Sequence, residues 1–183
     1  MGEDRFKIDG DKTFYHSERI RKWTEANGDW DKAKKVYPIY VEISPSGACN
    51  HRCTFCAVDY IGYKTRFLDA EIMEKRLKEM GELGVKSVMY AGEGEPLLHK
   101  KIAKMIEDAK KSGIDVAITT NATALHEKLS REILSSITWI KASINAGTRE
   151  SYAKIHKTSE SHFDLAWKNM GEAVKIRKEL GLD

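Results

Sequence analysis

The sequence is poor in the features that mark membrane, secreted and nucleic-acid-coating proteins. Its 183 residues include only 3 prolines and 3 cysteines, and no apolar run approaches the roughly 20 residues of a membrane span. The amino-terminal residues mix acidic and basic side chains without an apolar segment, which is not typical of a secretory signal. The net charge is only +3, so a strongly basic nucleic-acid-binding protein is excluded. We therefore expect a globular, cytoplasmic protein without a membrane or nucleic-acid partner.

The cysteines are few, odd in number and crowded together. Cys49, Cys53 and Cys56 are the only ones in the chain. A disulfide framework normally uses an even number of cysteines spread along a small secreted chain. These three thiols therefore favour a reducing compartment and metal ligation.

From Tyr37 onward, stretches typical of strands alternate with stretches typical of helices. Repeated strand–helix units predict a parallel sheet with right-handed crossovers, and hence an α/β fold. The predicted strands cover residues 40–44, 87–91, 115–120 and 139–145. Four helices are predicted between and after these strands. The first begins after the capping residue Asp69, the second covers residues 102–112, the third includes residues 129–134, and the fourth begins at a cap on Ser161.

Polar residues occupy one face of the first and last predicted strands. In the first, Val41 and Ile43 lie opposite Glu42 and Ser44. The last strand divides in the same way, with Ile140, Ala142 and Ile144 opposite Lys141, Ser143 and Asn145. A flat doubly wound sheet is apolar on both faces, so this division favours a curved sheet, as in a barrel or partial barrel.

The residues before this region differ in composition. Residues 1–36 are polar and mixed in charge, with Phe14, Ile20, Trp23 and Trp30 at loose spacing. They predict one short helix in an amino-terminal helical extension that acts as a structural cap. The remaining residues, 37–183, form the predicted core domain.

The cysteine loop has the spacing C-x-x-x-C-x-x-C and directly follows a predicted strand. Three thiolates in one tight loop can hold three corners of an iron–sulfur cubane and leave the fourth iron open. Ferredoxins that only carry electrons use four cysteines, and structural zinc sites close their shell with four ligands. An open cluster used for catalysis is the favoured interpretation. A Cys₃His zinc site completed by His51, and a loop without metal, are the alternatives.

With an aromatic residue, Phe55, directly before the last cysteine, this loop resembles that of the radical S-adenosylmethionine (radical SAM) enzymes. The resemblance covers about residues 37–183. It implies an enzyme with a 4Fe–4S cluster on Cys49, Cys53 and Cys56, whose open iron is chelated by S-adenosylmethionine. One electron then cleaves that cofactor to a 5′-deoxyadenosyl radical, which abstracts hydrogen from a small-molecule or peptide substrate. A reductant such as flavodoxin or ferredoxin is the implied partner.

The resemblance also implies the residues that bind S-adenosylmethionine. The family's Gly-Gly-Glu-Pro motif, which contacts the methionyl amine, is matched by Gly94-Glu95-Pro96, with Glu93 in place of the first glycine. Strand ends supply contacts to the carboxylate and ribose, and Phe55 packs near the adenine. The predicted cofactor-binding residues are Phe55, Gly92, Gly94, Glu95, Asn121, Ser143 and Asn145. No catalytic acid or base is predicted.

Three further expectations follow. His99, His126, His156 and His162 are predicted to be solvated surface residues. Arg52 and Lys64 flank the cysteine loop, where basic side chains attract anions or an electron donor. The chain holds about four strand–helix units against six in the family's partial barrel, so we expect a core truncated at its carboxyl-terminal side. A non-catalytic cluster- or zinc-binding module, or an inactive fragment, is the alternative function.

Overall fold

The computed structural model describes residues 15–62 and 64–182. The chain divides into two compact units, one ending at Ile39 and the other beginning at Tyr40. This division lies close to the predicted domain boundary at residues 36–37. Phe14, which the sequence analysis places with the amino-terminal helix, lies outside the described residues.

The amino-terminal unit contains two short helices where one is predicted. α1 (Ser17–Ala26) ends at Asn27, and α2 (Trp30–Ala33) follows almost at once. The separation has a local cause, because Asn27 and Gly28 have φ angles of 44° and 81°, in the left-handed region that stops a helix. The Asp29 side chain then accepts backbone N–H groups of the first turn of α2 and starts the helix again.

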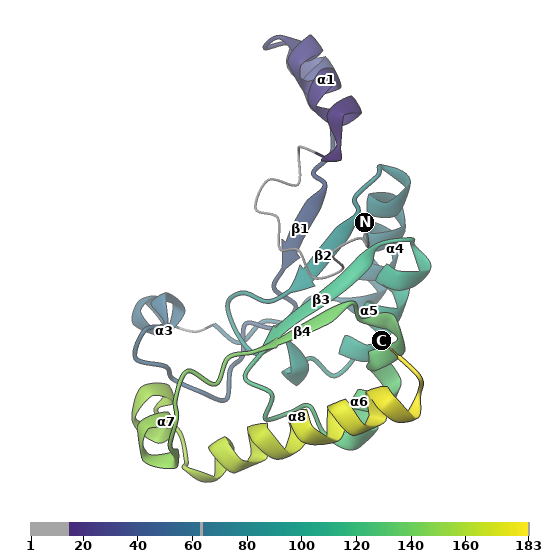
Figure 1. Cartoon of the computed structure of the whole chain (residues 1–183). Coiled ribbons are helices and arrows are strands. Elements are labelled where there is room, and N and C mark those ends of the chain that lie inside the picture. The colour runs from purple at the N-terminus through teal and green to yellow at the C-terminus, as the bar shows by residue number, and fades with distance from the viewer. Residues whose placement is uncertain (1–14, 63, 183) are drawn as a thin grey trace. The chain divides into compact units, whose positions relative to one another are not determined.

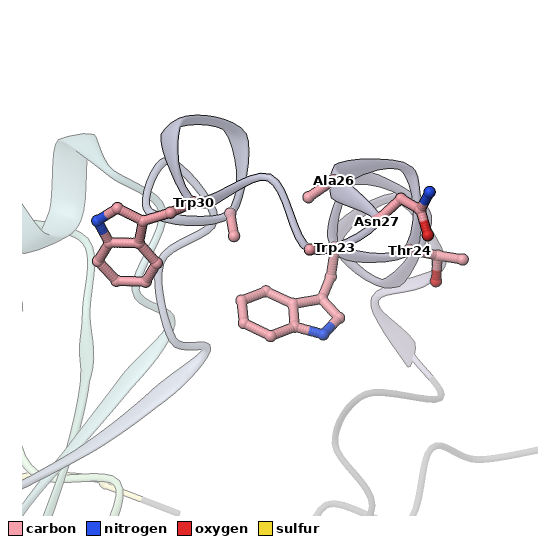
Figure 2. Close-up of a pocket in the computed structure, with 7 residues that line it drawn as sticks. Trp23, Thr24, Ala26, Asn27 and Trp30 are labelled. Atoms are coloured by element: carbon pink, nitrogen blue, oxygen red, sulfur yellow. The ribbon is translucent and has the colours of Figure 1, made fainter.

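A hollow of about 420 Å³ lies within this unit. Figure 2 shows the indole rings of Trp23 and Trp30 extending from the two helices beside it. Both rings are largely exposed, at 58% and 70%. The lining contains no ionisable side chain, so the hollow offers nothing to metal or acid–base chemistry; it consists of Trp23, Thr24, Ala26, Asn27, Gly28, Trp30 and Ala33.

The second unit is built on a four-stranded parallel sheet, as predicted (Figure 1). Its strands lie side by side in chain order: β1 (Tyr40–Ile43), β2 (Ser87–Tyr90), β3 (Asp115–Thr120) and β4 (Trp139–Ala142). The helices between and after the strands are α3 (Ala57–Ile61), α4 (Ala70–Glu82), α5 (Ile102–Lys111), α6 (Glu127–Ile133), α7 (Arg149–His156) and α8 (Ser161–Glu179), with 3₁₀ turns η2 (Pro96–Leu98) and η3 (Leu134–Ser136). None of the described helices is both long and apolar enough to cross a membrane.

The two faces of the sheet differ, as the alternating residues predict. Parallel strands in chain order with right-handed crossovers carry their connecting helices on one side. On that side Val88, Val116 and Ile118 are fully buried, and the Tyr90 hydroxyl donates to the Met105 carbonyl of α5 at 2.9 Å. On the other side, Glu42 and Lys141 remain exposed. An unclosed sheet of this kind agrees with a partial barrel.

β1, β2 and α5 each end one residue earlier than predicted, and larger differences concern β4, the last helix and two short helices. β4 ends at Ala142, where its partner β3 ends at Thr120, so the expected extension to Asn145 has no strand to pair with. The last helix begins at Ser161, with Glu160 rather than Ser161 in the cap position. The short helices α3 and α7 are not predicted at all, while α4 does begin after Asp69, whose carboxylate accepts the N–H groups of Glu71 and Ile72.

Candidate cofactor and metal site

The three cysteines lie in the connection between β1 and α3, at the carboxyl end of the sheet. None of the three thiols forms a disulfide, and all three are half-buried. The Arg52 guanidinium donates to the carbonyls of Cys49 and His51, at 2.8 and 2.7 Å, and its Nε lies 3.4 Å from the Asp59 carboxylate. Its donors therefore hold the loop itself. The predicted attraction of anions or an electron donor remains a prediction.

The backbone of the cysteine loop is also bound to a distant helix. The N–H of Arg52 donates to the His156 carbonyl at 3.0 Å, and that of Thr54 to the Ile155 carbonyl at 2.8 Å. Both acceptors lie at the carboxyl end of α7, where carbonyls have no partner within the helix. Figure 1 shows both α3 and α7 at this end of the sheet. α7 is thus a structural part of the site.

Glu95 joins the ends of β2 and β3. It is 2% exposed, and its carboxylate accepts from the Thr120 hydroxyl at 2.5 Å and from the N–H groups of Asn121 and Leu97 at 2.8 and 3.1 Å. Burial raises the pKa of the Glu95 carboxyl above its ordinary value, while these three donors oppose the rise. The predicted contact of this residue with the methionyl amine remains a prediction.

The glycines before Glu95 bring this turn against the cysteine loop. A Cβ on Gly94 would collide with the carbonyl oxygens of Ser46 and Ala48, and the N–H of Glu95 donates to Ala48 O at 2.8 Å. Gly92 has a φ of 101°, which L residues rarely adopt. The substituted position, Glu93, is exposed, and its backbone N–H donates to the Ser44 hydroxyl at 3.1 Å.

Asn121 extends the same network to the cysteine loop. Its side-chain amide donates to Asn50 Oδ1 at 2.7 Å, and the Asn50 amide donates to the Thr123 hydroxyl at 2.8 Å. From α8, the Asn169 amide donates to the carbonyls of Ala122 and Thr123 at 2.9 and 3.0 Å. Sequence reasoning missed Asn50, Thr123 and Asn169, because only the fold brings them together.

The other predicted cofactor-binding residues, Phe55, Ser143 and Asn145, lie outside the hydrogen-bond network of Glu95 and Asn121. The Phe55 ring is 62% exposed, with its centroid 5.9 Å from that of His156. Ser143 and Asn145 follow β4 at the same end of the sheet. The Ser143 N–H donates to the Thr120 carbonyl at 2.8 Å, and Asn145 is exposed with a φ of 52°.

Two of the histidines predicted to be on the surface are buried, so that prediction is wrong for them. His99 is 6% exposed, with Nε2 2.8 Å from the Leu68 carbonyl, and His156 is 1% exposed. The imidazole of His156 lies between Cys53, whose Sγ is 3.0 Å from Nδ1, and the Ile144 carbonyl, 2.7 Å from Nε2. His126 is exposed, as predicted, and His162 is half-buried.

His51 also points inward, next to the aromatic residues of α7 and α8. It is 1% exposed, with ring centroids 5.3 Å from His156 and 5.7 Å from Tyr152. Burial, together with repulsion from His156 and His162, lowers the pKa of His51 to about 4, so the ring is neutral at physiological pH. Burial and the neighbouring thiols raise the pKa of Cys53 to about 11.

The three thiols suit a cluster better than a single shared ion. Among the described residues, the trio of ligand atoms lying within 4.8 Å of one another belongs to His51, Cys53 and His156, and not to the three cysteines. In this arrangement the three cysteine sulfurs are not gathered as the ligand atoms of a single ion are. His51 does not complete a Cys₃His set, because its ring is placed with only one of the three thiols. The donor set fits a cluster with thiolates at three corners.

The sequence of residues 43–180 matches the family model described as "Radical SAM superfamily". The chain belongs to the radical SAM superfamily. Members of this superfamily use a 4Fe–4S cluster and S-adenosylmethionine, in agreement with the donor set of the cysteine loop.

Two of the curated relatives that match this chain are GTP 3′,8-cyclases. GTP 3′,8-cyclase of Chlorobaculum tepidum is 34% identical over 118 residues, which cover 63% of this chain and 36% of the cyclase. GTP 3′,8-cyclase of Aquifex aeolicus is 32% identical over 160 residues, which cover 82% of this chain and 47% of the cyclase. This radical SAM chain thus spans less than half the length of either relative.

Solved structures share the fold. The crystal structure of Streptococcus suis SuiB bound to the precursor peptide SuiA has a TM-score of 0.64 at 18% identity. The match covers 97% of this chain and 44% of SuiB. This similarity confirms the predicted partial-barrel fold.

Proposed function

We propose that Cys49, Cys53 and Cys56 bind a 4Fe–4S cluster and that the chain uses it with S-adenosylmethionine. The observation that carries the proposal is the set of three half-buried thiols, none of them in a disulfide, in a loop fixed at the carboxyl end of a parallel sheet. When bound, the cluster and S-adenosylmethionine supply a 5′-deoxyadenosyl radical for hydrogen abstraction. The residues of this chain supply the position and the surroundings of that chemistry.

Positioning begins with the hydrogen bonds around the loop. Ala48 O accepts from the N–H of Glu95, and Asn50 Oδ1 accepts from the Asn121 amide, so the ends of β2 and β3 fix the residues flanking Cys49. Because Cys53 has a pKa of about 11, its thiol keeps its proton until a metal displaces it.

S-adenosylmethionine is proposed to lie across the strand ends beside the loop. The turn from Gly92 to Glu95 is proposed to face the methionyl amine, and Gly92 lets this turn pack against Ser44, which a Cβ would meet at 2.8 Å. Ser143 and Asn145 supply polar groups for the carboxylate and ribose, and the exposed ring of Phe55 is available to pack on the adenine. The buried Asn121 acts by holding Asn50 as well as through any contact of its own.

We propose a nucleotide as the substrate, with a reaction similar to that of the GTP 3′,8-cyclases. The support is the identity of 32–34% to two such enzymes over the core that carries the cysteine loop. A one-electron donor such as flavodoxin or ferredoxin is the proposed reductant.

The cluster assignment is tested by anaerobic reconstitution with iron and sulfide. We expect about four irons per chain, a paramagnetic resonance signal that changes when S-adenosylmethionine is added, and release of 5′-deoxyadenosine after reduction. Cys53→Ala removes a ligand and is expected to abolish cluster assembly. Thr54→Ala is the matched control, because it alters an exposed loop residue without removing a thiol. Full iron content in the Cys53 variant would refute the ligand assignment.

The substrate assignment is tested separately. The reconstituted chain is incubated with GTP, S-adenosylmethionine and reductant, and products are analysed by mass spectrometry. GTP-dependent 5′-deoxyadenosine formation supports a nucleotide substrate. Cofactor cleavage at the same rate with and without each of the four ribonucleoside triphosphates would reject this class of substrate while leaving the cluster assignment intact.

A further inference from the structure

A second set of metal-ligating side chains lies beside the cluster loop. Ligand atoms of His51, Cys53 and His156 lie within 4.8 Å of one another, and two of the three residues are fully buried. The loop supplies the first two and α7 supplies the third. The backbone hydrogen bonds from Arg52 and Thr54 to the end of α7 hold these segments in place without any metal.

The His156 ring is oriented as a metal ligand. Its Nε2 lies 2.7 Å from the Ile144 carbonyl, which can only accept a hydrogen bond, so Nε2 carries the hydrogen. The Nδ1 lone pair of the neutral ring is then directed toward Cys53 Sγ, 3.0 Å away. Histidines that bind metals in proteins usually donate their other N–H to a carbonyl or carboxylate in this way.

One of the two His51 ring nitrogens has no hydrogen-bond partner in the described part of the chain. Nε2 lies 3.0 Å from His162 Nδ1, whereas Nδ1 is buried and has no hydrogen-bond partner in the described part of the chain. A buried polar atom without a partner is unusual in a folded protein, and a bound ion would satisfy it. Coordination through Nδ1 would leave the contact between Nε2 and His162 in place.

We propose that His51, Cys53 and His156 form a mononuclear Zn²⁺ site in the cluster-free protein, with water as the fourth ligand. Two imidazole nitrogens and one thiolate match the ligand preference and the tetrahedral geometry of zinc. Binding displaces the thiol proton of Cys53 to solvent, so one proton is released for each zinc bound. No change of oxidation state is involved.

The site shares one thiol with the proposed cluster. Cys53 cannot ligate zinc and a cluster iron together, so occupancy of one site excludes the other; this competition rests on the proposed function, whereas zinc binding does not. A zinc ion here would protect the Cys53 thiol and hold the loop against α7 before the cluster is assembled. Zinc would in turn have to dissociate before a cluster iron could bind Cys53.

The test uses the full chain, stripped of metal with a chelator under anaerobic conditions. Zn²⁺ is titrated against a chromophoric chelator, and Co²⁺ serves as a spectroscopic substitute. We expect one Zn²⁺ per chain, and with Co²⁺ both the visible bands of tetrahedral cobalt and a thiolate charge-transfer band. Absence of stoichiometric zinc binding, or cobalt spectra without the thiolate band, would overturn the proposal on the unmodified chain.

Variants distinguish this site from the cluster site. His51→Asn and His156→Asn are expected to weaken zinc binding at least about 100-fold, because losing even an outer partner of a ligand costs roughly 10–100-fold. Cys49→Ser is the matched control, which is expected to keep zinc affinity while losing the cluster. Circular dichroism checks that each variant is folded. If Cys49→Ser loses zinc and folded His51→Asn retains it, the ion is bound by the cysteines and the proposal is wrong. Failure of the cluster proposal would instead appear as absent iron and sulfide with zinc binding unchanged.

Discussion

Replacing Gly94 by alanine is expected to damage the cysteine loop without touching a cysteine. The new Cβ would lie 2.9 Å from the Ala48 carbonyl carbon and closer still to the carbonyl oxygens of Ala48 and Ser46. These are backbone atoms, which cannot rotate away as the end of a flexible side chain can. The start of the loop must therefore move away from the turn that follows β2.

The size of the effect follows from two contributions. Overpacking of a tightly packed region costs about 1–3 kcal/mol. The same displacement removes the acceptor of the Glu95 N–H, now 2.8 Å from Ala48 O, which adds about 0.5–1.5 kcal/mol. We expect the free energy of unfolding to fall by about 2–4 kcal/mol, or roughly 5–15 °C in Tm for a chain of this size.

The assay is urea unfolding followed by circular dichroism, together with iron content after reconstitution. Gly171→Ala is the control, because its Cβ meets nothing within 4 Å in the interior of α8. That substitution should stabilise the protein by about 0.5–1 kcal/mol, since glycine is a poor helix former. If Gly94→Ala unfolds within about 0.5 kcal/mol of the unmodified chain and takes up full iron, the packing argument is refuted.

Three further predictions concern other buried groups. Asn169→Leu removes the side-chain donor to the carbonyls of Ala122 and Thr123, of which Ala122 keeps the N–H of Leu125, and should lower the free energy of unfolding by about 1–3 kcal/mol, measured in urea. An unchanged midpoint would contradict this prediction. Tyr90→Phe removes the donor to the Met105 carbonyl and should cost about 1 kcal/mol, measured by thermal unfolding; a gain in Tm would contradict it. Because burial raises the pKa of the Glu95 carboxyl, the folded chain holds that proton more tightly than the unfolded chain does. The contribution of this proton to the free energy of unfolding is complete below the unfolded pKa near 4.5 and is lost as pH rises through the higher folded pKa. Glu95→Gln should flatten this part of the stability–pH curve, and an unaltered curve would assign the slope to another group.

Much of the fold could be predicted because local patterns and tertiary packing agree. β3 has the predicted bounds, since its alternating residues are bonded to strands on both sides. β4 was predicted too long, because its sequence continues the alternation past the point where β3 ends. α7 was missed because its eight residues are mostly polar and its start depends on Thr148 and Ser151 capping each other.

The candidate site was predictable only in part. The cysteines are close in sequence, so their spacing alone predicts a shared metal centre. The burial of His156 could not be predicted, because it depends on contacts with Cys53 and Ile144 that the fold creates. The role of Glu95 in joining two strand ends likewise depends on the position of Thr120, which is 25 residues away.

The attachment of the cysteine loop to α7 has a consequence for synthesis. The contact between Cys53 and His156 joins residues 103 positions apart. At translation rates of about 5–20 residues per second, the thiols leave the ribosome roughly 5–20 seconds before the segment that encloses them. During that interval the three thiols of the nascent chain are accessible to oxidants and to metal ions. The yield of the protein in cells should therefore depend on the rate of translation of the codons between Cys53 and His156.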